Sequence, residues 1–124
     1  MKKRITGFHE DAESHWVAEL ECGHGQHVRH DPPWMEREWV TSEEGRAGRI
    51  GSALNCVRCD EAALAVAKAV AIEAKKAFAE AYESAGLSGL CDEGRIEAAL
   101  GAIAALPLAE IAERALEIPE KPQI

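Results

Sequence analysis

The sequence predicts an α+β fold in which a small β-rich N-terminal domain, with one short helix, precedes a three-helix C-terminal segment. The chain has 124 residues, which suits one compact domain or two very small ones. All five histidines, all three tryptophans and three of the four cysteines lie before residue 60. The remainder is rich in alanine, which favours helix. These observations place a boundary just after Cys59 and give domains 1–60 and 61–124.

Short strands are expected in the first domain. Apolar residues occupy every second position in 16–22, which is typical of a strand with one buried face. The Cys-Gly-His-Gly segment 22–25 follows as a tight turn in which both glycines can take positive φ. Residues 5–8 and 26–30 are expected to form further strands. Residues 54–59 are expected to return the chain as a last strand that carries a second cysteine turn.

One short helix is expected in the first domain and three helices in the second. Thr41 as N-cap, with Glu44 three positions later, fits a capping box and predicts a helix that ends near Gly48 or Gly51. In the second domain, apolar stripes at helical spacing predict helices at about 61–85, 92–105 and 107–117.

The ends and faces of these three helices are also predicted. Asp60 and Asp92 are expected to cap the first two helices, and Pro107 suits the first turn of the third. Pro119 and Pro122 mark a frayed tail. The residues of the third helix expected to face inward are Leu108, Ile111, Ala112 and Leu116.

The spacing of cysteine and histidine in the first domain predicts a metal site. Cys22-x-His24 is followed, after 31 intervening residues, by Cys56-x-x-Cys59. Structural zinc takes four thiolate or imidazole ligands in a tetrahedron, and each of these two turns can supply two of them. A unit of about 60 residues is marginally stable without such a staple. We therefore predict one Zn²⁺ per chain, bound by Cys22, His24, Cys56 and Cys59.

Two other interpretations of this pattern stay open. His27 competes with His24, because Cys22-x4-His27 is also sterically possible; His24 is favoured because the glycine turn points it inward alongside Cys22. The cysteines could instead be buried small hydrophobic residues, or Cys56 and Cys59 could form a disulfide. A closed four-ligand site leaves no open position for water, which argues against zinc catalysis.

A strip rich in donors and flat aromatic surface follows the first cysteine turn. Its members are His27, Arg29, His30 and Trp34. Arginine and tryptophan are frequent interface anchors, so the strip is predicted to bind a partner. The competing interpretation is that the three tryptophans form the core of a domain that is poor in large side chains. Cys91 stands apart, just before Asp92, and is expected to pack against the helices.

The charge of the chain restricts the classes of partner. The net charge is −8, which disfavours undirected binding to nucleic acid or to an anionic membrane surface. The first eight residues contain basic side chains without a following apolar run, so no secretory signal is expected, and no segment is apolar enough to span a bilayer. These features predict a cytoplasmic protein, in which clustered cysteines more often bind metal than form disulfides.

Several motifs of the first domain together resemble a bacterial family of unknown function, the DUF 3565 group, described as pressure-regulated-protein-like. The resemblance runs from about residue 5 to residue 60, includes all four metal-type positions, and implies no activity; none is found for residues 61–124. The motifs are Gly7-Phe8-His9-Glu10-Asp11, Trp16-Val17-Ala18-Glu19-Leu20, Cys22-Gly23-His24-Gly25-Gln26-His27-Val28-Arg29-His30, Pro32-Pro33-Trp34, Trp39-Val40-Thr41, Glu44-Gly45-Arg46, Leu54-Asn55-Cys56 and Cys59-Asp60.

The sequence thus favours a non-catalytic, zinc-stabilised adaptor of unknown protein partner, whose helices pack on the zinc domain or form a homodimer. One alternative is a metal- or redox-responsive regulator that releases zinc when its thiols are oxidised. Another is a nucleic-acid-binding module that uses the strip of His27, Arg29, His30 and Trp34. An enzyme is the least favoured class, because the sequence has no phosphate-binding glycine loop, serine nucleophile elbow or His-Glu zincin helix.

Overall fold

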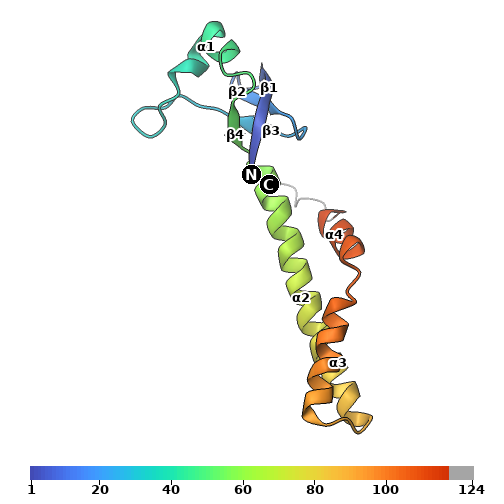
Figure 1. Ribbon diagram of the computed structural model, residues 1–124. Helices are drawn as coiled ribbons and strands as arrows, with labels where there is room; N and C mark the ends of the chain where they lie inside the picture. The colour runs from blue at the N-terminus through green and yellow to red at the C-terminus, as the bar shows by residue number, and fades with distance from the viewer. Residues whose placement is uncertain (118–124) are drawn as a thin grey trace. The chain divides into compact units, whose positions relative to one another are not determined.

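The computed structural model describes residues 1–117 and has the predicted α+β architecture (Figure 1). The chain divides into two compact units, unit 1 from Met1 to Glu61 and unit 2 from Ala62 onward. Pro119 and Pro122, predicted to mark the tail, lie outside the described residues. Within those residues, no helix combines the length and the apolar character that crossing a membrane requires.

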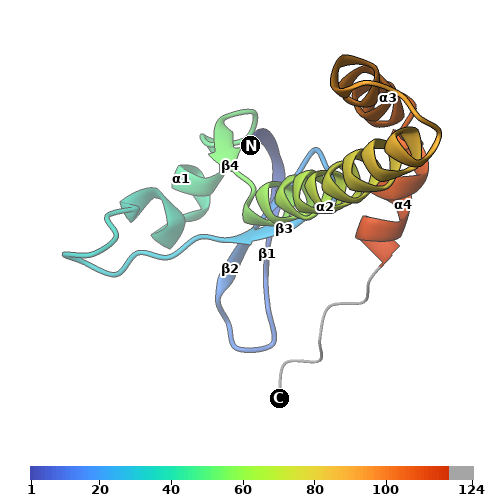
Figure 2. The same cartoon turned by 90° about the horizontal axis from the view of Figure 1, so that it is seen from below.

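Unit 1 is built on a four-stranded antiparallel sheet with the strand order β3-β2-β1-β4 (Figure 2). The strands are β1 (Lys2–Glu10), β2 (Trp16–Leu20), β3 (Gly25–His27) and β4 (Ala53–Asn55). The first half of β1 pairs with β4 and its second half with β2. The register shifts between Ile5 and Gly7, which is the irregularity that lets one long strand bend and serve both neighbours.

The core of unit 1 packs against this sheet. Ala18 and Cys56 are fully buried, and Ile5, Leu20, Val28 and Val40 are almost so. The partly buried side chains that pack against them include Phe8, Trp16, Trp39 and Leu54. This cluster joins the sheet to the segment that follows β3, so the cysteine turns are held by the same packing as the strands.

The short helix of unit 1 begins one residue later than predicted. Helix α1 spans Glu43–Ala47, after a 3-10 turn η1 at Glu38–Thr41. Ser42, not Thr41, is the N-cap, and its hydroxyl oxygen accepts a hydrogen bond from the Gly45 backbone N–H at 3.0 Å. The Thr41 hydroxyl donates instead to the Glu38 carbonyl, because Thr41 ends the preceding turn.

Helix α2 spans Val57–Leu87 and begins earlier than predicted. The expected strand over 54–59 ends at Asn55, and Cys59 lies in the first turn of the helix. Asp60 is not its cap: the Asp60 carboxylate accepts a hydrogen bond from the Asn55 side-chain amide at 2.7 Å and also pairs with the N-terminal amine. The helix can start early because other groups satisfy its first backbone N–H groups.

Unit 2 contains the rest of α2, then α3 (Asp92–Ala104) and α4 (Leu108–Glu117). Helix α3 runs back along α2 (Figure 1), and the Arg95 guanidinium lies 4.0 Å from the Tyr82 ring centroid and donates to the Tyr82 carbonyl. Cys91, not Asp92, occupies the N-cap of α3, without a side-chain cap bond. Cys91 is exposed, contrary to the packing expected for it.

The faces of α4 only partly match the prediction. Ile111 is buried and Ala112 is half-buried, as expected, but Leu108 and Leu116 are each 56% exposed. Pro107 lies just before the helix, and its carbonyl accepts a hydrogen bond from the Ile111 N–H. The apolar stripe of α4 is therefore wider than the surface that α2 and α3 cover.

Candidate metal centre

The turn between β2 and β3 supplies two of the predicted ligands, Cys22 and His24. Gly23 lies between them with φ of +86°, a conformation that favours glycine. Backbone bonds from Gly23 N to the Leu20 carbonyl and from Leu20 N to the His24 carbonyl close the turn. Gly25, for which the sequence analysis also allowed positive φ, does not adopt it. It lies in β3, where a Cβ would stand 2.8 Å from a Val17 methyl, so this position requires glycine for its close approach.

The start of α2 supplies the other two, Cys56 and Cys59. The Cys59 N–H donates to the Cys56 sulfur at 3.4 Å, which is the bond an N-cap side chain normally accepts. The Gln26 side-chain oxygen accepts from the Val57 N–H at 3.1 Å. This bond ties β3, next to the first turn, to the beginning of the helix. Gln26 was not singled out from the sequence, because its role depends on a contact 31 residues away.

The four ligand atoms converge on one point. Cys22 Sγ lies 3.8 Å from Cys56 Sγ, and His24 Nδ1 lies 3.5 Å from Cys56 Sγ and 3.3 Å from Cys59 Sγ. All four atoms are within 4.8 Å of one another. With zinc–sulfur bonds of about 2.3 Å and zinc–nitrogen bonds of about 2.0 Å, a tetrahedral ion separates two sulfurs by about 3.8 Å and a sulfur from a nitrogen by about 3.5 Å. The spacing of the side chains fits such an ion.

The structure also bears on two alternative interpretations, a disulfide between Cys56 and Cys59 and a ligand role for His27. All four cysteines of the chain are free thiols, so the Cys56–Cys59 disulfide considered as an alternative is absent. His27 lies outside the cluster, since its Nε2 is 2.8 Å from an Asp11 carboxylate oxygen. His24 is therefore the histidine that the fold brings to the three cysteines.

The electrostatics of the cluster favour a cation. Burial raises the pKa of the Cys59 thiol to about 11, together with the facing sulfurs of Cys56 and Cys22. Burial also acts to raise the pKa of Cys22, but hydrogen bonds from the His24 backbone N–H and from the neighbouring thiols outweigh it and lower that pKa to about 7. Of these two thiols Cys22 is therefore the one that ionises more readily, and a divalent ion would stabilise the thiolate form of both.

The arrangement of Cys22, His24, Cys56 and Cys59 could hold a metal ion. Fold and cluster together define unit 1 as a small antiparallel-sheet domain with a Cys3His metal-type site. Residues 6–63 match the family described as "Protein of unknown function (DUF3565)", which confirms the resemblance predicted from the sequence. The match covers the cluster and the sheet except for the start of β1, and it ends within the first turns of α2. No curated protein and no solved structure gives a significant match to the chain.

The four members of the predicted binding strip differ in their contacts and exposure. His27 is half-exposed beside Asp11, and the His30 ring accepts a hydrogen bond from the Arg37 backbone N–H at 3.0 Å. Arg29 is exposed, and Trp34 is 86% exposed. Among these four residues, His27 and His30 have side-chain hydrogen bonds within unit 1. Arg29 and Trp34 instead present their side chains to solvent.

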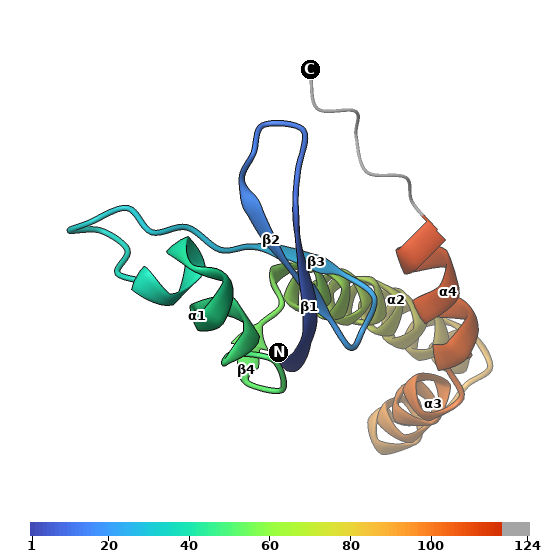
Figure 3. The same ribbon diagram turned by 90° about the horizontal axis from the view of Figure 1, so that it is seen from above.

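The three tryptophans divide between the two predicted roles. Trp16 and Trp39 pack against the core, where the guanidinium carbon of Arg46 lies 3.7 Å from the Trp16 ring centroid and Phe8 contacts Trp39. Trp34 lies instead in the loop after β3, which projects from the sheet (Figure 3, cyan). Two backbone hydrogen bonds between Asp31 and Met35 join the two ends of this loop.

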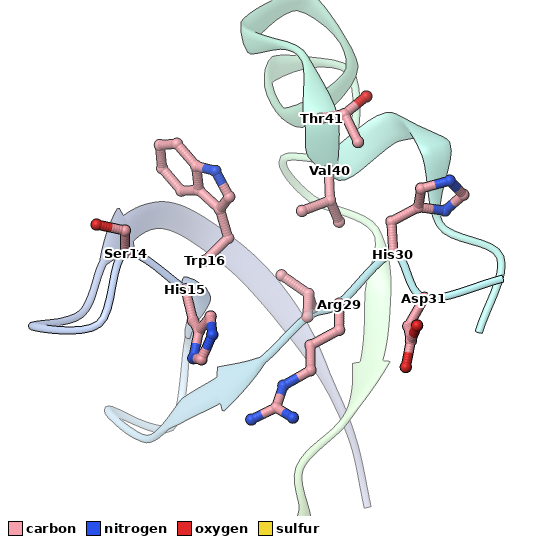
Figure 4. Close-up of a pocket in the computed structure, with 9 residues that line it drawn as sticks. Ser14, His15, Trp16, Arg29, His30, Asp31, Val40 and Thr41 are labelled. Atoms are coloured by element: carbon pink, nitrogen blue, oxygen red, sulfur yellow. The ribbon is translucent and has the colours of Figure 1, made fainter. Parts of the chain in front are cut away.

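A shallow groove of about 390 Å³ lies beside this loop. Val28 and Val40, which are both buried, contribute apolar surface, and Trp16, Arg29 and His15 add aromatic and basic groups. In Figure 4 the side chains of Arg29 and His15 extend to the same side of the groove, whereas Trp16 extends to the other. The groove thus combines a flat aromatic surface with a cation that faces solvent.

Asp11, which the sequence analysis names only as part of a family motif, fixes the connection between β1 and β2. One carboxylate oxygen accepts backbone hydrogen bonds from Glu13 and His15, both at 2.9 Å, and the other contacts His27. The backbone N–H of His15, followed by the His27 side chain, lowers the pKa of Asp11 to about 2. The signal was present in the sequence, since aspartate commonly bonds to backbone groups two residues on.

Replacing Asp11 by alanine is expected to lower the melting temperature of unit 1 by a few degrees, because three acceptor contacts are lost. Asp11→Asn, which keeps one acceptor oxygen, should retain most of the stability. Since the folded pKa lies below the ordinary value of 3.8, the ionised carboxylate stabilises the fold fully above about pH 4 and loses this effect as the pH falls toward 2. Thermal melts at neutral pH should give a lower melting temperature for Asp11→Ala than for Asp11→Asn. Equal melting temperatures for the two variants would contradict this prediction.

Proposed function

We propose that unit 1 is a non-catalytic, zinc-stabilised interaction domain that binds a protein partner through Trp34 and the adjoining groove. The single observation that carries the binding surface is the 86% exposure of Trp34 on a closed, projecting loop, while the other two tryptophans pack against the core. Large aromatic side chains on rigid supports are typical anchors of protein interfaces, because little conformational entropy is lost when they bind.

The identity of the ion is part of this proposal. Three thiolates and one imidazole form a donor set that zinc prefers, and the ligand spacing fits zinc–sulfur and zinc–nitrogen bond lengths. Four protein ligands complete the tetrahedron, so no position stays open for a reacting water. The ion in this account joins the β2–β3 turn to the start of α2 and holds the sheet from which the Trp34 loop projects.

The groove indicates the chemistry of the partner. Arg29 is exposed at its edge, and an arginine guanidinium binds carboxylates through two parallel hydrogen bonds. Because Arg46 already lies over the Trp16 ring, the exposed Trp34 ring is the aromatic surface that suits an apolar side chain of the partner. A partner segment with an apolar residue near an aspartate or glutamate therefore fits this surface best. A nucleic acid fits less well, since Asp31 lines the same groove and the chain has a net charge of −8.

Trp34→Ala is expected to weaken partner binding by about 2 kcal/mol or more, a loss of roughly thirtyfold in affinity. Immobilised full-length protein would be used to capture partners, with quantitative mass spectrometry of the bound fraction. Ile50→Ala is the matched control, because Ile50 is another exposed apolar residue of unit 1, at 49% exposure. Arg29→Gln should give a smaller loss for the same partners.

Trp34→Ala and Arg29→Gln should keep the metal content and the melting temperature of the parent protein, since neither side chain contacts the cluster. The proposal fails if proteins captured by the parent are retained equally by Trp34→Ala and Ile50→Ala. It also fails if the captured material is nucleic acid that dissociates with rising salt.

A further inference from the structure

The three helices of unit 2 cover few of their own apolar side chains. Among the described residues of this unit only Ala85, Ala99 and Ile111 are buried, and two of them are alanines. Small units need a substantial buried core to be stable, so an apolar surface this open requires a covering partner. The large apolar residues left exposed are Leu64, Ile72, Leu87, Leu90, Ile96, Leu100, Leu108 and Leu116.

The charges around these residues differ between the helices. On α2, the exposed Lys68 lies one turn from both Leu64 and Ile72, and Lys75 and Lys76 lie one turn beyond Ile72. On α3 and α4 the corresponding neighbours are acidic. Glu97 precedes Leu100 by three positions, and Glu113 precedes Leu116 in the same way; both glutamates are exposed. Acidic side chains also lie beside α2, since Glu61 precedes Leu64 by three positions and Glu73 follows Ile72 at the groove described below. The lysine border is therefore confined to the surface around Ile72, whereas Leu100 of α3 and Leu116 of α4 are bordered by glutamate.

A groove between α2 and α4 adds shape to this surface. Its volume is about 310 Å³, and Ala69, Ile72, Ile111 and Ala115 line it, with Glu73 and Arg114 at its polar edge. Ile72 is 66% exposed at this groove. An opening with alanine walls can receive an apolar side chain from another helix without repacking of unit 2.

We propose that unit 2 is a self-association domain whose occupant is a second copy of the same chain. The lysine-bordered surface of α2 in one copy packs against the glutamate-bordered surface of α3 and α4 in the other. In a twofold-symmetric dimer this contact forms twice, so all the complementary charges are used. A membrane or a nucleic acid fits poorly, because the glutamates of α3 and α4 would face an anionic surface.

The size of the helices suits such an interface. The part of α2 in unit 2 has 26 residues, from Ala62 to Leu87, and is about 39 Å long at 1.5 Å per residue. A stable interface requires about 800 Å² from each partner. Two such helices side by side, together with the exposed leucines of α3 and α4, offer a surface of that order.

Sedimentation equilibrium of the full chain over micromolar concentrations tests the proposal. The expected mass is twice the chain mass of 13.4 kDa. Lys68→Glu with Lys75→Glu should weaken the dimer about tenfold or more, because like charges then face each other. Ile72→Asp should weaken it at least as much, and circular dichroism should show that the helices remain folded. A monomer of 13.4 kDa at all concentrations would overturn the proposal.

A charge exchange distinguishes a second copy from any other occupant. The Lys68→Glu, Lys75→Glu protein is mixed with a Glu97→Lys, Glu113→Lys protein, and native mass spectrometry counts the species. The expected result is a heterodimer that is tighter than either variant's homodimer. Lys2→Glu with Arg4→Glu, in unit 1, is the control of equal charge change and should leave the dimer unaffected. A statistical mixture, or dimers that no variant weakens, would contradict the arrangement.

The Trp34 proposal concerns different residues, so the two can fail separately. Trp34→Ala and Arg29→Gln should leave the sedimenting mass unchanged. Conversely, the Lys68→Glu, Lys75→Glu protein should still bind a partner of unit 1 when that partner is held at high concentration.

Discussion

Removal of the metal with a strong chelator is expected to unfold unit 1 while the helices of unit 2 stay helical. The cluster joins two segments that are more than 30 residues apart, and structural zinc contributes on the order of 10 kcal/mol, about the whole stability of a small domain. All three tryptophans belong to unit 1, so their fluorescence reports its unfolding. The far-ultraviolet circular dichroism reports mainly α2, α3 and α4.

Cys56→Ser is the matching substitution and Cys91→Ser its control. Cys56 is fully buried in both the cluster and the core, whereas Cys91 is exposed in unit 2. Cys56→Ser should therefore give the tryptophan emission of the chelated protein, and Cys91→Ser that of the parent. If chelation removes the ion but the tryptophan emission does not change, the ion does not hold unit 1 together.

Gly45→Ala is expected to destabilise unit 1 by about 1–3 kcal/mol, the usual cost of forcing an extra methyl into a packed site. A Cβ at this position would lie 2.4 Å from the Trp39 carbonyl oxygen and 2.8 Å from the Ser42 hydroxyl. The first of these is a backbone atom of the η1 region and cannot rotate away. The substitution would push η1 from α1 and displace Val40, which lines the groove beside the Trp34 loop.

Gly48→Ala, at the C-cap of the same helix, serves as the control. A Cβ there has its nearest neighbour at 3.4 Å, and Gly48 has φ of −67°, which any residue adopts. Alanine should therefore be neutral or slightly stabilising at this position. Urea unfolding followed by tryptophan fluorescence measures both variants. Similar urea midpoints of unfolding for Gly45→Ala and Gly48→Ala would show that the close packing of η1 on α1 does not contribute to the stability of unit 1.

The fold class and the four clustered side chains could be predicted because their signals are local. Cys22 and His24 share one turn, and Cys56 and Cys59 share one helical turn, so each pair is close in any compact structure. The choice of His24 over His27 followed from the glycine turn alone. The partner of His27, Asp11, lies 16 residues away and gave no comparable signal.

The predicted helix caps were less successful, because two of the predicted cap residues, Thr41 and Asp60, have competing partners. Asp60 is drawn to the N-terminal amine and Asn55, and the Cys56 sulfur occupies the capping position that Asp60 was expected to fill. Ser42 replaced Thr41 by a shift of one residue, since the preceding 3-10 turn uses the Thr41 hydroxyl. Such competition depends on tertiary contacts that no local pattern contains.

The burial of large side chains was also beyond local patterns. The sequence could not separate Trp34 from Trp16 and Trp39, since only the path of the chain after β3 places Trp34 outside the core. In α4, helical spacing correctly aligned Leu108, Ile111 and Leu116 but could not tell how much of that stripe unit 2 itself covers. An apolar stripe predicts that a surface will be buried, not what will bury it.

The metal content of the untagged full-length protein, determined by elemental mass spectrometry, tests the central claim most directly. Reactive thiols are counted on the same sample. The account predicts one zinc per chain with Cys91 as the single rapidly titrated thiol, since Cys22, Cys56 and Cys59 would be bound. A protein that folds without any bound metal and titrates all four cysteines would contradict it.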